Sequence, residues 1–164
     1  MKQSYSSALT SINSKKLPSG YKVMHKMIQN GELSHIKEIL DYGCGRYVNH
    51  ISSDAMNYCD IWSGYDLTWY PNKETLLTRK NLTICSNVLN VIDSDEVVDD
   101  ILMLLGKISD TVIITIYEGN KTGVGKVSKA DCYQRNERLS DYVERAKNLG
   151  LNASCKYGAL IINK

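Results

Sequence analysis

Three residues that can hold a small ligand lie at the end of a short apolar run and directly after it. The sequence EILDYGCGR places Asp41 at the end of a short apolar run, with Gly43 and Gly45 directly after it. Glycine lacks a Cβ and tolerates positive φ, so the backbone can turn sharply here and approach a ligand closely. The next segment has helical spacing, and the first N–H groups of a helix attract hydrogen-bond acceptors. The pattern therefore predicts a ligand-binding turn between a strand and a helix.

The sequence lacks the third glycine of the dinucleotide-binding pattern G-x-G-x-x-G. Tyr47 and Val48 occupy the space where that glycine would fall. It normally lets the helix pack beside a pyrophosphate, so its absence argues against NAD and FAD. The negative charge of Asp41 would also repel phosphate but would suit a cationic amine.

A second carboxylate follows the next apolar run. Asp66 ends that run, at a place where a carboxylate can accept hydrogen bonds from two ribose hydroxyls. S-adenosylmethionine carries an amine and a ribose and has no phosphate. It therefore fits both the acidic residues and the missing glycine, and we predict it as the cofactor.

Strand-like and helix-like segments alternate along the 164 residues. Continuous apolar runs such as TVIITIY are typical of strands buried on both faces of a parallel sheet. The clearest helical segment is DSDEVVDDILMLLGKI, for which Asp93 and Glu96 predict a capping box. The final ASCKYGALIINK predicts a closing antiparallel pair. We expect one α/β domain over residues 1–164, a Rossmann-like three-layer sandwich around a mostly parallel sheet of about six strands.

Four short motifs resemble those of the class I S-adenosylmethionine-dependent methyltransferases. ILDYGCGR is similar to motif I of that family, GYD to motif II, and TICSNVLNVID to the fourth strand and its loop. With YQRN, they look most like small phage and bacterial methyltransferase-like proteins, whose relatives are associated with DNA phosphorothioation genes. The resemblance implies cofactor contacts at Asp41, Gly43, Gly45, Asp66, Ser86 and Asn87.

Two features depart from the family pattern. Tyr47 replaces a glycine that often continues motif I. Only 17 residues separate Asp66 from Ile84, and a parallel crossover alone needs about a dozen or more. We therefore expect the family's third strand and its helices to be absent or shortened, which leaves the adenine side of the pocket open.

Methyl transfer to an alcohol or amine also requires a group that removes a proton. Glu118, after the last buried strand, and Tyr133, in the polar segment 131–136, are the catalytic candidates. Each has a plainer interpretation, Glu118 as an exposed strand-end charge and 131–136 as the entry to a helix. The Gly-rich segment 119–136 is either a surface loop or a lid. Its glycine spacing does not match the phosphate-binding P-loop that it resembles.

Several other functions are disfavoured. A net charge of +2 and a pI near 8.2 do not indicate a nucleic-acid partner. Asn87 is not followed by Pro-Pro-aromatic, and there is no Pro-Cys pair, so DNA base methylation is disfavoured. The three histidines are isolated, so we expect no metal site. Scattered cysteines and the lack of an apolar leader or span predict a cytoplasmic protein without membrane contact.

The resulting hypothesis is a methyltransferase with an unidentified acceptor. Residues 1–35, which carry Lys15 and Lys16 ahead of the first predicted helix, are expected to form a helical lid over the cofactor. Two alternatives remain open: a non-catalytic cofactor-binding module or partner subunit of another protein, and an enzyme that cleaves the cofactor. Tyr47 and the shortened middle section favour the binding module, because both erode the pocket. The retained acidic residues and glycines favour genuine cofactor binding.

Overall fold

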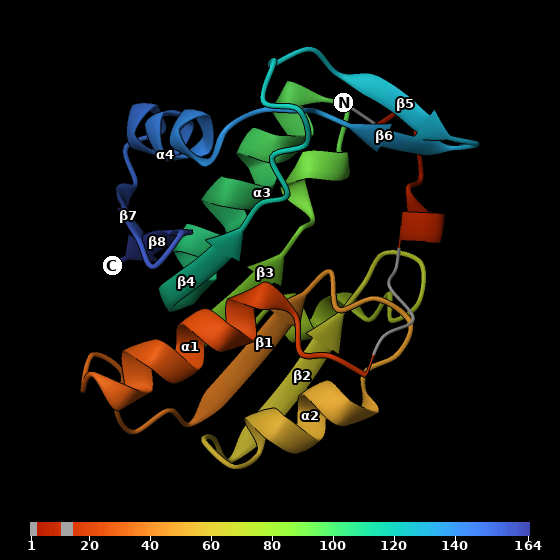
Figure 1. Cartoon of the computed structure of the whole chain (residues 1–164). Helices are drawn as coiled ribbons and strands as arrows, with labels where there is room; N and C mark the ends of the chain where they lie inside the picture. Colours follow the sequence, from red (N-terminus) through yellow and green to blue (C-terminus); the bar gives the residue numbers. More distant parts are fainter. Residues whose placement is uncertain (1–2, 11–14) are drawn as a thin grey trace.

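The sheet contains six strands in the order β2-β1-β3-β4-β8-β7 (Figure 1). The structure is a computed structural model that describes residues 3–10 and 15–164. The strands are β1 (Glu38–Tyr42), β2 (Ile61–Tyr65), β3 (Lys80–Ser86), β4 (Ser109–Thr115), β7 (Asn152–Lys156) and β8 (Ala159–Asn163). The first four strands of this order are parallel, and β8 pairs antiparallel with β4 and β7. The predicted mostly parallel sheet with a closing antiparallel pair is confirmed.

Helices cover both faces of the sheet. The α-helices of the described residues are α1 (Ser19–Gln29), α2 (Asn49–Ala55), α3 (Asp95–Ile108) and α4 (Leu139–Asn148). Helices α1 and α2 pack on one face, and α3 and α4 pack on the other (Figure 1). Neighbouring strand residues alternate between the faces, so Ile39 packs with the first pair of helices and Leu40 with the second. Burial on both faces explains why the strands are continuous apolar runs.

The section between β2 and β3 is short, as predicted. Strand β2 is an edge strand of the sheet. The residues that follow it contain one turn of 3-10 helix, η2 (Lys73–Leu76), and no further strand of the sheet. The family's third strand and its flanking helices are therefore missing from this part of the described chain.

The Gly-rich segment 119–136 contains a hairpin that the sequence did not predict. Strands β5 (Lys126–Lys129) and β6 (Cys132–Gln134) pair antiparallel in a separate two-stranded sheet. This hairpin lies beside the N-terminal segment (Figure 1), which includes the 3-10 helix η1 (Ala8–Thr10). A further 3-10 helix, η3 (Leu89–Val91), follows β3 and contacts β6.

The start of α3 differs from the prediction by one residue. Ser94 is the N-cap, because its Oγ accepts a hydrogen bond from the Val97 N–H at 3.3 Å. The Asp93 carboxylate instead accepts from the N–H of Ser4 at 3.0 Å. Serine and aspartate are equally good N-caps, so adjacent candidates cannot be separated from sequence alone.

Candidate functional site

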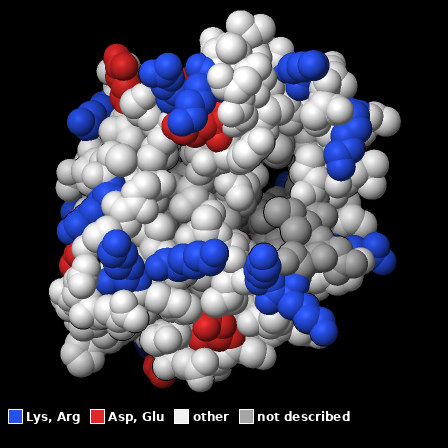
Figure 2. Space-filling view, in the orientation of Figure 1, with Lys and Arg blue, Asp and Glu red and all other residues white. Residues whose placement is uncertain are grey.

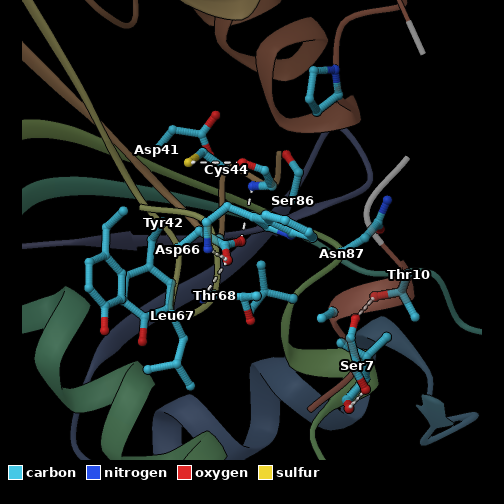
Figure 3. A pocket seen from close by; sticks show the side chains of 18 of the residues that line it. Ser7, Thr10, Asp41, Tyr42, Cys44, Asp66, Leu67, Thr68, Ser86 and Asn87 are labelled. Atoms are coloured by element: carbon cyan, nitrogen blue, oxygen red, sulfur yellow. Dashed lines mark hydrogen bonds between the residues drawn. The ribbon is translucent and has the colours of Figure 1, made fainter. Parts of the chain in front are cut away.

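A cavity of about 830 Å³ opens at the carboxyl ends of β1, β2 and β3 (Figure 3). Its volume lies within the range of roughly 300–1,000 Å³ that is usual for sites that bind small molecules. The residues predicted to contact a cofactor all line it, namely Asp41, Gly43, Gly45, Asp66, Ser86 and Asn87. The fold therefore brings these residues together around one space.

The glycine turn between β1 and α2 is fixed by its neighbours. Gly43 and Gly45 have φ of +77° and +73°, values that L-residues with side chains rarely adopt. The N–H groups of Gly43 and Cys44 donate to the carbonyl of Tyr65 at 2.7 and 3.1 Å. A Cβ on Gly43 would lie well inside 3.0 Å of the Val88 side chain. The turn thus needs glycine both for its backbone angles and for its contact with the loop after β3.

Asp66 connects this turn to the loop after β2. Its carboxylate accepts hydrogen bonds from the N–H groups of Gly45, Thr68 and Trp69, at 3.0, 2.9 and 3.1 Å (Figure 3). A carboxylate offers about four acceptor positions, so Asp66 keeps about one for a ligand hydroxyl. The sequence had suggested contacts with two ribose hydroxyls, and the present arrangement leaves room for one.

Asp41 is buried beneath the turn, with 2% of its surface exposed. The Tyr21 hydroxyl donates to its Oδ2 at 2.8 Å, and Trp62 Nε1–H donates to that hydroxyl at 2.9 Å. Burial raises the pKa of Asp41 to about 7, against the hydrogen bond from Tyr21, and the nearby charge of Asp66 raises it further. Asp41 therefore titrates near neutral pH, and a cation beside it would favour its ionised form.

The first turn of α1 forms a wall of the cavity, and no residue in it was predicted individually as a contact, although it lies within the predicted lid segment 1–35. The Gly20 N–H donates to Ser86 Oγ at 3.1 Å, and the Ser19 and Thr115 hydroxyls are 2.6 Å apart. A Cβ on Gly20 would lie 2.5 Å from Ile84 Cγ2, so glycine allows the helix to approach β3 closely. Lys22, in the same turn, lines the cavity. The sequence does not indicate these contacts, because only the packing of α1 on β3 brings Gly20 to Ser86.

Another wall of the cavity is apolar. It includes Tyr42 and Tyr65, whose ring centroids are 5.2 Å apart, and three residues of α3. Those residues are Val97, Ile101 and Leu104. Leu67, at the edge of this wall, is 65% exposed. Flat apolar and aromatic surfaces of this kind suit a heteroaromatic ring.

Comparison with solved structures identifies proteins of similar fold. The sequence matches no protein-family model and no curated protein. The structure is similar to 1,6-didemethyltoxoflavin-N1-methyltransferase from Burkholderia thailandensis, solved with 1,6-didemethyltoxoflavin and S-adenosylhomocysteine. The TM-score is 0.63 at 13% identity, over 87% of this chain and 74% of that chain. A methyltransferase from Clostridium acetobutylicum has a TM-score of 0.58 at 10% identity, over 87% and 88%.

This chain has the fold of S-adenosylmethionine-dependent methyltransferases. At such low identities the likeness shows the fold alone, and the predicted Rossmann-like class is confirmed. The closer resemblance to small phage and bacterial proteins stays a prediction, as do the individual cofactor contacts.

Neither catalytic candidate lies among the described residues that line the cavity of this methyltransferase fold. The Glu118 carboxylate accepts from the Leu139 N–H at 2.8 Å and pairs with Lys121 at 2.9 Å. Both interactions lower the pKa of Glu118, the Leu139 bond most, which makes it a weaker base. The ring of Tyr133 stacks on Tyr5 with centroids 5.5 Å apart. Their catalytic roles stay predictions, and the geometry does not favour them.

The segment 131–136 also holds the structure together. Arg135 is 6% exposed and forms ion pairs with Asp95 and Glu137. Asn136 is also buried and donates a hydrogen bond to the carbonyl of Val124 at 2.9 Å. These two side chains therefore stabilise neighbouring loops.

Residues 4–10, here called the N-terminal clasp, connect the hairpin to the cavity. The Ser6 N–H donates to the Asp131 carboxylate at 3.1 Å, and the Ser7 hydroxyl donates to the carbonyl of Val91 at 3.0 Å. Ser7 and Thr10 line the cavity (Figure 3). Residues 1–2 and 11–14 of the predicted lid lie outside the described residues, and the lid function itself stays a prediction.

Asp131→Ala is expected to loosen the clasp. The change removes the acceptor of the Ser6 N–H and hydroxyl bonds, so the backbone of residues 4–10 should open more often. Hydrogen exchange measured by mass spectrometry should be several-fold faster in these residues than in the wild type. Lys129→Ala, an exposed change in the same hairpin, is the control. If residues 4–10 exchange as slowly in Asp131→Ala as in the wild type, Asp131 does not hold the clasp in place.

Three further observations concern metal ions, cysteines and membrane-spanning helices. In residues 3–10 and 15–164, no group of three or more His, Cys, Asp or Glu side chains could hold a metal ion. The five cysteines are all free. Within the same ranges, no helix is both long enough and apolar enough to cross a bilayer.

Proposed function

We propose that this protein binds S-adenosylmethionine in the cavity and transfers its methyl group to an acceptor. The observation that carries the proposal is the arrangement of two carboxyl groups around the glycine turn. Asp41 lies beneath the turn, and Asp66 is hydrogen-bonded to Gly45 within it. One carboxyl group suits the ammonium of the cofactor, and the other suits a ribose hydroxyl.

The rest of the cavity fits the rest of the cofactor. The apolar wall of Tyr42, Tyr65 and α3 suits the adenine ring. Two fold neighbours bear the name of methyltransferases, and one was solved with S-adenosylhomocysteine bound. Gly43 and Asn87 line the cavity between the two carboxyl groups and the clasp, and they would hold the sulfonium end of the cofactor, with Ser7 and Thr10 available to contact an acceptor.

Methyl transfer does not require the protein to form a covalent bond with either reactant. The acceptor attacks the methyl carbon in line, the carbon–sulfur bond breaks, and the sulfur keeps the electron pair. The protein must hold acceptor and donor in a near-attack geometry. An alcohol or amine acceptor must also lose a proton. His50 lines the cavity at the start of α2, and we propose it for this role in place of Glu118 and Tyr133.

A non-catalytic cofactor-binding subunit is the second candidate function. Two observations favour it. The sheet ends at β2, where the methyltransferase family has a further strand, and neither Glu118 nor Tyr133 lines the cavity. Both candidates require cofactor binding, so only methyl transfer separates them. Turnover of the cofactor without any acceptor would instead indicate a cleaving enzyme.

Asp66→Ala tests cofactor binding. The substitution removes a charged acceptor from the ribose and from three backbone N–H groups, so the affinity for S-adenosylhomocysteine should fall by roughly 10- to 100-fold. The measurement is calorimetric titration of folded variants. Asp60→Ala, at the other end of β2 and exposed, is the matched control and should bind like the wild type. Unchanged affinity in Asp66→Ala would refute the assignment.

A further inference from the structure

The amino-acid end of the proposed cofactor carries two opposite charges on one carbon atom. Asp41 can balance the ammonium, and the carboxylate, which is bonded to the same carbon atom, would then also lie near Asp41. A charge taken out of water without a partner is strongly unfavourable. A cation close to Asp41 would therefore favour binding of the cofactor's amino-acid end.

The first turn of α1 is the element packed against Asp41. The Tyr21 hydroxyl donates to the Asp41 carboxylate at 2.8 Å, and the Gly20 N–H donates to Ser86 Oγ at 3.1 Å. These contacts place the turn directly over the ends of β1 and β3. Lys22 follows Tyr21 in the sequence and lines the cavity.

Lys22 is available for a ligand. Its side chain is exposed, and it forms no ion pair or hydrogen bond within residues 3–10 and 15–164. By contrast, the nearby guanidinium of Arg46 lies over the rings of Trp69 and Tyr47, at 5.0 and 5.3 Å from their centroids. Arg46 is also absent from the described lining of the cavity.

Basic side chains lie on the face of the molecule that carries α1. Figure 2 shows Lys and Arg side chains spread across this face, together with groups of Asp and Glu side chains. Asp54, the acidic residue of α2, is paired with His25 at 2.7 Å. The described lining of the cavity contains two lysines, Lys16 and Lys22, beside the carboxyl groups of Asp41, Asp66 and Asp100.

We infer that Lys22 binds the carboxylate of the cofactor's amino-acid end, as the partner of Asp41, which takes the ammonium. This inference rests on the proposed function and adds to it a residue that no sequence motif indicated. Lys22 and Asp41 together form a zwitterion site, which distinguishes S-adenosylmethionine from nucleosides without an amino-acid end.

Lys22→Gln separates this role from a general effect on the cavity. Its affinity for S-adenosylmethionine should fall about tenfold, because one charge-assisted hydrogen bond is lost. Its affinity for decarboxylated S-adenosylmethionine, which lacks only the carboxylate, should equal that of the wild type. Lys22→Arg should retain most of the affinity for both ligands. Lys26→Gln makes the same charge change one turn further along α1, outside the described cavity lining, and is the control.

Calorimetric titration of the four proteins with both ligands gives distinguishable outcomes. Equal weakening of both ligands by Lys22→Gln, or no weakening of either, would overturn the carboxylate assignment and leave cofactor binding standing. If the wild type binds neither S-adenosylmethionine nor S-adenosylhomocysteine, the proposed function fails and this inference fails with it.

Discussion

Asp41→Asn should weaken cofactor binding strongly and leave the protein folded. The variant keeps an oxygen that can accept the Tyr21 hydroxyl bond but loses the negative charge that balances the ammonium. An unbalanced ammonium beside a buried amide is costly, so we expect the affinity for S-adenosylhomocysteine to fall by at least about 100-fold. Calorimetric titration at pH 8 is the measurement.

The same variant should be more stable than the wild type at high pH. The pKa of Asp41 is raised to about 7 by burial, so between about pH 4 and pH 7 the folded state holds a proton that the unfolded state has lost. Wild-type stability therefore falls as the pH rises through this window. Above pH 7 the full destabilisation by the buried, ionised Asp41 is present. The gain from Asp41→Asn should grow with pH, up to about 4 kcal/mol. Denaturant unfolding at pH 5 and pH 8 measures it.

The affinity and the stability of Asp41→Asn together show whether the Asp41 carboxylate serves binding or the fold. Lower stability of Asp41→Asn at pH 8 would show that the carboxylate holds the fold together. Wild-type affinity should also weaken about tenfold from pH 8 to pH 6, because Asp41 must ionise to balance the ammonium. Affinity that is independent of pH would contradict this account of Asp41.

Gly43→Ala should damage both the turn and the cofactor site. The added methyl would enter the space of the Val88 side chain, and the backbone φ of +77° is strained for alanine. Overpacking and a strained backbone angle together cost about 2–4 kcal/mol of unfolding free energy. The shifted turn should also reduce cofactor affinity by about 100-fold, because positioning errors of about 1 Å have effects of this size. Denaturant unfolding and calorimetric titration measure the two effects.

A second substitution tests the steric part of this prediction. Val88→Ala opens the space that the new methyl needs, so Gly43→Ala/Val88→Ala should recover part of the lost stability relative to Val88→Ala alone. Gly31→Ala is the matched control, because Gly31 has φ of +71° but no atom within 4 Å of its Cβ position. If Gly31→Ala is as damaging as Gly43→Ala, the contact with Val88 has no special effect.

The features predicted correctly from sequence are those set by neighbouring residues. Apolar runs indicated the strands, and the short connection after Asp66 indicated the missing strand. The glycine turn was also local, because Asp41, Gly43 and Gly45 lie within five residues of one another. Such local patterns predict secondary structure well where apolar residues recur at the period of a helix or a strand.

The features that sequence missed depend on contacts between distant segments. Tyr21 was not predicted to meet Asp41, because only the packing of α1 on the sheet brings them together. Glu118 was placed at a strand end, but β4 ends at Thr115 and the Glu118 carboxylate accepts from the Leu139 N–H instead. Side-chain partners of this kind follow from tertiary packing, which one sequence does not show.

The most direct test is a crystal structure of the protein with S-adenosylhomocysteine bound. We predict a ribose hydroxyl at hydrogen-bond distance from Asp66, and the amino-acid end of the ligand between Asp41 and Lys22. Adenine should lie against Tyr42 and α3. A ligand bound outside the cavity, or one in the reverse orientation with its amino-acid end at Asp66, would contradict the proposed function.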